Sequence, residues 1–214
     1  MSETALDIWI PDGYMTMPLS SIEERIGVVQ GLVDGMVPSP ATSLAHAVLP
    51  AAATLLTELA KRDARYCGIG RHTSSTGGLV TSCLTVCVYE TDGEQTNPRL
   101  ALTNLVESRL ESGDELGEIE LTDVDGRPML FSERITELPA PEIPAQPYTS
   151  DTTATYQLEA VVPSSDGSAI AAVEMSTAYV DYGPEFRRMI VDMARSVRFR
   201  PSDHPTARPS SLDL

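Results

Sequence analysis

Lysine and histidine are scarce in this chain of 214 residues. Lys61 is its one lysine beside 14 arginines, and there are three histidines. With 31 acidic and 15 basic residues, the formal net charge is −16, which argues against a protein that coats nucleic acid or an anionic membrane surface. Because Lys61 follows alanine, the chain also lacks a Gly-x-x-x-x-Gly-Lys phosphate-binding loop.

Cysteine and long apolar runs are scarce as well. Cys67, Cys83 and Cys87 are an odd set, and Cys83 and Cys87 would stand about 13 Å apart along one strand, too far for one disulfide or metal ion. We expect buried, reduced thiols. The most apolar stretch, residues 44–59, is too interrupted to span a bilayer, and the N-terminus lacks a basic signal region. We therefore expect a cytoplasmic protein without membrane insertion.

Helix and strand signals alternate along the chain. A Ser20/Ser21 capping box predicts a helix over residues 20–36, and Thr42 or Ser43 predicts a second over 42–63, kinked at Pro50. Asn97-Pro98 predicts a third, and Gly183-Pro184 starts the last. Extended segments are expected near the N-terminus and at residues 65–69, 79–89, 118–124, 127–138, 156–162, 169–180 and 197–199, with Asp125-Gly126 as a hairpin turn.

This order favours an α+β fold, an α/β sandwich. We expect a central, mostly antiparallel sheet of about six to seven strands with helices packed on its faces. The Pro-rich connector over residues 139–147 is too short to separate domains. We therefore predict a single domain over residues 1–200 and a frayed tail over residues 201–214.

Motifs for chemistry are few. The segment from Gly68 to Gly70 begins like a dinucleotide fingerprint but lacks its third glycine and the following helix. His72 precedes Thr73, Ser74 and Ser75, but no Gly-x-Ser-x-Gly elbow accompanies it. Asp123-Val124-Asp125-Gly126 resembles part of a calcium loop, although a hairpin explains it fully. We assign no catalytic, cofactor-binding or metal-binding residue.

Charge placement is more informative than any motif. Between Glu90 and Asp125 there are eleven acidic residues and two arginines, whereas the last helix and its end are locally basic. One interpretation is two solvated faces; the other is a polarised surface that orients a protein partner. On the second interpretation the partner-binding residues are Arg187, Arg188, Arg195 and Arg198.

The C-terminal third resembles the end of Mog1/PsbP-like domains. The carrying residues are Tyr179-Val180-Asp181-Tyr182 and the helix that follows from Pro184 to Phe199; the opening Trp9-Ile10-Pro11-Asp12-Gly13-Tyr14 is also similar to the family's start. The hairpin around Asp125 matches the middle of the family loosely. This resemblance implies an α/β sandwich that serves as an accessory or adaptor protein. It carries over no functional residue.

Three functions follow from the sequence. The first is a non-catalytic adaptor that binds a protein through the polarised surface, alone or as a homo-oligomer. The second is a small-molecule or lipid carrier with a helix-grip (START-like) cavity. Its lining candidates are methionines: Met15, Met17, Met129, Met175, Met189 and Met193. The third is a hydrolase or transferase that uses His72, which would need a carboxylate packed against that histidine. The scarcity of lysine beside abundant arginine, alanine and valine is typical of a high-GC bacterium.

Overall fold

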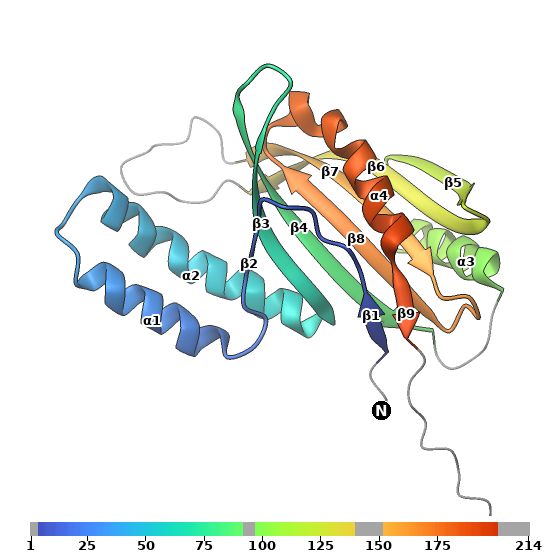
Figure 1. Cartoon of the computed structure of the whole chain (residues 1–214), viewed down its shortest axis with the longest axis horizontal. Coiled ribbons are helices and arrows are strands. Elements are labelled where there is room, and N and C mark those ends of the chain that lie inside the picture. The colour runs from blue at the N-terminus through green and yellow to red at the C-terminus, as the bar shows by residue number, and fades with distance from the viewer. Residues whose placement is uncertain (1–3, 92–96, 140–151, 201–214) are drawn as a thin grey trace, which may run out of the picture.

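The computed structural model describes residues 4–91, 97–139 and 152–200. The expected connector after Pro139, the tail after Arg200 and His204 lie outside these ranges. The described chain forms a seven-stranded antiparallel sheet with helices on both faces, which confirms the predicted α+β class (Figure 1). In spatial order the strands are β2 (Tyr14–Thr16), β3 (Ala64–Thr73), β4 (Leu79–Glu90), β8 (Ala169–Thr177), β7 (Thr152–Pro163), β6 (Arg127–Pro139) and β5 (Glu118–Val124).

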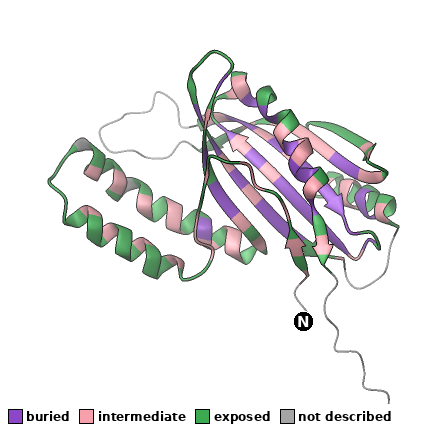
Figure 2. Cartoon of the chain, viewed as in Figure 1, coloured by how far each residue is buried: buried purple, intermediate pink, exposed green. Residues whose placement is uncertain are grey.

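Helices cover the two faces unequally. The 3-10 helix η1 (Val180–Phe186) and α4 (Arg187–Ser196) lie across one face, and α3 (Pro98–Glu111) packs on the other, behind β6 and β7 in Figure 1. Beneath α4, the side chains of Ile190 and Met193 meet Leu158, Val173 and other residues of the main core. Figure 2 shows this buried core running along the central strands. A short sheet of β1 (Ala5–Asp7) with β9 (Arg198–Arg200) joins the two ends of the described chain.

Local signals explain several element boundaries. The Asn97 side chain accepts a hydrogen bond from the Arg99 amide, as expected of the cap of α3. Asp125 and Gly126 both have positive φ, 54° and 76°, the conformation that the tight turn between β5 and β6 requires. The expected hairpin is therefore confirmed, and it accounts for the residues that resemble a calcium loop.

Two cap predictions were wrong. Ser21 lies in the left-handed region and its side chain makes no capping bond to α1 (Ile22–Asp34). The capping box belongs instead to α2 (Pro40–Lys61), where Ser39 and Thr42 bond reciprocally. A proline at the start of α2 suits this earlier boundary, because the first helical position needs no amide donor. The helix also continues through Pro50.

The hairpin formed by α1 and α2 projects from the sheet (Figure 1). Among the side chains of α2 whose burial is described, the buried one is Leu56, in the C-terminal part of the helix beside β3. In the described part of the chain, α2 is the one helix long and apolar enough to cross a membrane, and 6% of that apolar window is buried. Length and composition alone do not distinguish a membrane span from a helix on the surface of a folded protein.

Candidate functional site

The four arginines predicted to bind a partner lie on α4 and β9, and most of them bond within the chain. Arg187 holds Glu133 on β6 through two bonds of 2.6 and 2.5 Å, and Arg195 holds Asp125 through bonds of 2.8 and 3.2 Å. The Arg198 guanidinium donates to the backbone oxygens of Arg195 and Val197. Arg188 has a side chain that is 93% exposed and makes one loose ion pair of 3.8 Å with Asp192.

Two of these pairs fasten α4 across the sheet. Arg187 ties the first residue of the helix to β6, and Arg195 ties its last turn to the β5–β6 turn. Arg127 strengthens the second attachment, because its guanidinium donates to the backbone oxygens of Arg195 and Val197 at 2.8 and 2.9 Å. Free carbonyls at a helix end attract cations, so Arg127 and Arg195 suit this position.

The ion pairs also set the protonation of the groups that they join. The Arg187 guanidinium holds the pKa of the Glu133 carboxyl below its ordinary value. Asp125 in turn raises the pKa of Arg195. Beside Glu133, burial and then the carboxylate raise the pKa of Tyr156 to about 12. All these groups therefore keep their charged or neutral state at neutral pH.

Between the two attachments lies a groove of about 680 Å³, bounded by α4 on one side and by β5 on the other. Its floor is apolar and is made by Phe131, Leu158, Ile190 and Val191. Carboxylates stand along its β5 side. The remaining lining residues are Glu118, Ile119, Glu120, Thr122, Val124, Ser132, Glu133 and Arg187.

Strand register explains the acidic rim. Glu118 pairs with Glu133 and Glu120 pairs with Phe131, so both glutamates point to the same face as α4. Arg187 compensates Glu133, whereas Glu118 and Glu120 are exposed and make no ion pair in the described part of the chain. β5 is also an edge strand, with one backbone side unpaired in the sheet order. The sequence located the acidic segment but not its position opposite α4.

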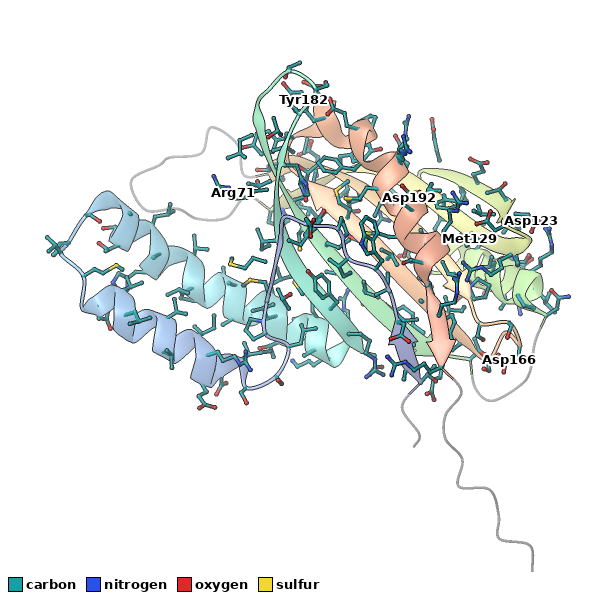
Figure 3. All side chains as sticks on the ribbon, in the orientation of Figure 1. Arg71, Asp123, Met129, Asp166, Tyr182 and Asp192 are labelled. Atoms are coloured by element: carbon teal, nitrogen blue, oxygen red, sulfur yellow. The ribbon has the colours of Figure 1, made fainter. Side chains whose placement is uncertain are left out.

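Arginines of α3 pair with acidic side chains on the opposite face of the sheet from α4. Arg99 of α3 pairs with Asp123 at the far end of β5, and Arg109 of α3 grips Glu159 of β7 with bonds of 2.6 and 2.9 Å. In Figure 3, Asp123 is labelled on the β5 side of the sheet, near α3. The acidic segment and the basic last helix, which the sequence separates, are joined in the fold by the ion pair between Asp125 and Arg195.

His72 lies in a small cluster above the core rather than in an open site. Its Nε2 is 3.1 Å from Ser82 Oγ, which is 2.9 Å from the Tyr14 hydroxyl. Ser82 is only 4% exposed, and burial lowers the pKa of His72. No hydrogen bond or ion pair joins His72 to a carboxylate among the described residues. The neighbouring loop binds η1 instead, through Ser75 to Glu185 and Thr76 to Tyr182, which Figure 3 labels.

A second hollow of about 310 Å³ lies on the opposite face, between the end of α2 and α3. It is polar, and its floor includes Glu159 and Glu174, which face each other across β7 and β8. Burial and the nearby Glu159 carboxylate raise the pKa of Glu174. In the described ranges, no hydrogen bond or ion pair reaches the Glu174 carboxylate.

The other candidates pack into the protein. Met129, Met175 and Met193 are fully buried in the main core, and none of the predicted methionines lines the groove. Cys67 and Cys87 are buried and Cys83 is partly so, with Cys67 diagonally beside Cys83 across β3 and β4. Within the described ranges, no cluster of three or more histidine, cysteine or acidic residues could hold a metal ion.

No model of a known protein family matches this chain, and no curated protein is significantly similar to it. Membership of the Mog1/PsbP-like family therefore stays a prediction.

Proposed function

We propose that this protein is a non-catalytic adaptor that holds a cationic, amphipathic segment of a protein partner in the groove between α4 and β5. The observation that carries the proposal is the pairing of an apolar floor with an acidic rim in one hollow of about 680 Å³. As the sequence led us to expect, we place this adaptor in the cytoplasm.

The floor and the rim would act on different parts of such a segment. Phe131 and Val191 are partly exposed and offer apolar surface to leucine-like anchors, which supply most of the affinity of a peptide in a groove. Glu118 and Glu120 would attract lysine or arginine on its other side and fix its orientation. Each exposed pair would add about 0.5–1 kcal/mol.

The arginines would support this function from within the fold. Arg187 and Arg195 hold the two ends of α4 and thereby keep the groove open between them. Arg188 has a free guanidinium edge on the outer side of α4, where it could contact an acidic part of the same partner. In this proposal, the charge-polarised surface expected from the sequence consists of the two sides of the groove: the acidic side on β5 and the basic helix α4.

Peptide binding to the purified full chain tests the proposal. The probe is a fluorescent helical peptide of leucine and lysine, compared with the same peptide in leucine and glutamate. We expect the lysine peptide to bind, and we expect E118Q/E120Q to weaken this binding about 5–30-fold, since two ion pairs are lost.

A matched variant separates the groove from the general charge of the protein. E107Q/E111Q removes two exposed glutamates from α3, outside the groove, and should leave the peptide affinity unchanged. Val191→Arg places a cation on the groove floor and should abolish binding. Equal losses in E118Q/E120Q and E107Q/E111Q would show that the peptide responds only to net charge, and the groove proposal would fail.

A small amphiphilic ligand is the second candidate, because about 680 Å³ lies within the usual size of a small-molecule site. E118Q/E120Q and Val191→Arg also distinguish such a carrier from the adaptor. A neutral apolar dye that binds wild type and E118Q/E120Q equally, but not Val191→Arg, would favour the carrier over the adaptor.

A further inference from the structure

The hairpin of α1 and α2 leaves apolar side chains uncovered on both helices. Val28 and Leu32 of α1, and Leu44, Val48 and Leu55 of α2, are between 42% and 65% exposed. Figure 2 shows the hairpin as the part of the molecule with the least burial. These five residues are called the outer stripe below. Scattered apolar residues on a surface are ordinary, but a contiguous set marks an interface.

Helical spacing shows that the outer stripe is contiguous. Each of its members comes one position before a less exposed residue. Val33, Ala45 and Leu49 are half-buried and Leu56 is buried, whereas Val29 is still 43% exposed. Successive residues of a helix differ by about 100° around its axis. On both helices, therefore, the residues of the outer stripe point about 100° away from the less exposed side, in the same rotational sense. Because α1 and α2 run antiparallel as a hairpin, equal rotation places both stripes on the same side of the hairpin. The result is one apolar face across two helices.

We infer that this apolar face binds the same face of a second copy of the chain, so that two hairpins form an antiparallel four-helix bundle. Two helices with one uncovered apolar side are half of such a bundle, and a two-fold axis closes it without leaving a free interface. The surface is distinct from the groove beside α4, so this inference does not depend on the proposed adaptor function.

Charge distribution favours a second copy over other occupants. The chain carries −16, but residues 22–62 contain four acidic and three basic residues, and Ala41–Thr57 contains none of either kind. The hairpin also projects from the acidic body (Figure 1). Two copies could therefore meet through their least charged segments while their acidic sheets stay apart, which limits the repulsion between them.

The dimensions of the hairpin fit an interface. At about 1.5 Å per residue, α1 is about 20 Å long and α2 about 33 Å long, and each helix is about 10 Å wide. The face is therefore on the order of 500 Å² in projection, and side-chain relief brings it toward the ~800 Å² per partner of a standard interface.

The same dimensions argue against a lipid bilayer. The hairpin starts after β2 and ends before β3, neighbouring strands of one sheet, so both ends of the hairpin lie on one side. A membrane span by α2 would force α1 to return through the bilayer, yet its length of about 20 Å is less than the ~30 Å hydrocarbon core. Glu23 and Glu24 in its first turn oppose insertion further.

Mass measurement on the full chain tests the inference. We expect light scattering at micromolar concentration to give twice the 23.1 kDa of one chain. L32E/V48E puts two charges on the outer stripe and should weaken the dimer at least about 100-fold. G31E/S43E adds the same charge one position before Leu32 and Leu44, pointing away from the stripe, and should leave the dimer intact. Circular dichroism checks that each variant is folded.

Charge reversal tests whether the two stripes face each other. L32K/V48K alone should be monomeric, and a mixture with L32E/V48E should restore a dimer, because opposite charges then meet across the bundle. A monomeric wild type, a dimer that survives L32E/V48E, or a mixture that stays monomeric would overturn the inference. So would flotation of wild type with neutral phosphatidylcholine vesicles, which would assign the face to lipid.

Discussion

At the scale of single residues, one row across the sheet places two carboxylates side by side. Ser132, Glu159, Glu174 and Thr85 are consecutive partners on β6, β7, β8 and β4. Arg109 compensates Glu159 with two bonds, whereas burial and Glu159 raise the pKa of Glu174. The two glutamates therefore have opposite effects on stability at neutral pH.

We expect Glu174→Gln to stabilise the protein by about 1 kcal/mol at pH 7. A raised pKa means that the folded state binds a proton more tightly than the unfolded chain, so ionisation costs stability as pH rises. The gain should disappear below about pH 4.3, the ordinary glutamate value, where both states are protonated. Urea unfolding at pH 7 and below about pH 4.3 measures the change in the free energy of unfolding.

Glu159→Gln, which leaves Arg109 without its partner, should destabilise the protein by about 2 kcal/mol. Stabilisation by both changes would contradict this explanation.

Some residue roles could be predicted from the sequence and others could not. The roles of Asn97, Asp125 and Gly126 depend on neighbouring residues, and the predictions for them were confirmed. The partners of Arg187 and Arg195 are Glu133 and Asp125, which are 54 and 70 positions away. Sequence spacing contains no information about such pairs, so the inward ion pairs of the basic helix could not be foreseen.

At the scale of elements, the same limit applies to helix ends. The short-range patterns located α1, α2 and α3 within a few residues. They assigned the capping box to Ser20 or Ser21 instead of Ser39, because a Ser-x-x-Glu pattern was present at one site and Thr42 replaced the usual Glu at the other. They also missed the contribution of Arg127, on a distant strand, which caps the end of α4 together with Arg198.

Arg127 provides the prediction for α4. Arg127→Met should cost about 1 kcal/mol, because the carbonyls of Arg195 and Val197 keep the bonds from Arg198 but lose those from Arg127. The hydrogen-exchange rates of the α4 amides should increase in the Arg127→Met variant. Arg188→Met removes an exposed arginine from the same helix and should behave like wild type. Equal exchange in both variants would show that Arg127 does not secure α4.

At the scale of the whole molecule, order along the chain determines fold class but not strand order. Hairpin signals predicted the neighbours β5–β6 and β7–β8. The pairing of β4 with β8, separated by α3 and three strands, joins the earlier and later strands in one sheet, and the groove forms where α4 lies across that sheet beside β5. That pairing depends on matching apolar faces, a property of the assembled core. The candidate groove was therefore beyond sequence reasoning, although its acidic and basic segments were not.

The charge of −16 gives the last prediction. Ion pairs such as Arg187–Glu133 and Arg195–Asp125 weaken with salt, but they are in direct contact and involve few charges. The remaining excess of acidic residues repels over longer distances, and this repulsion is screened when the Debye length falls from about 30 Å at 0.01 M salt to about 8 Å at 0.15 M. Relief of repulsion should therefore dominate, and the melting temperature should rise by a few degrees over this range.

Because salt would also favour the proposed dimer, the same titration is made with L32E/V48E. An equal rise in that variant assigns the effect to the acidic body of each chain, whereas a fall with salt would show that the ion pairs outweigh the net charge.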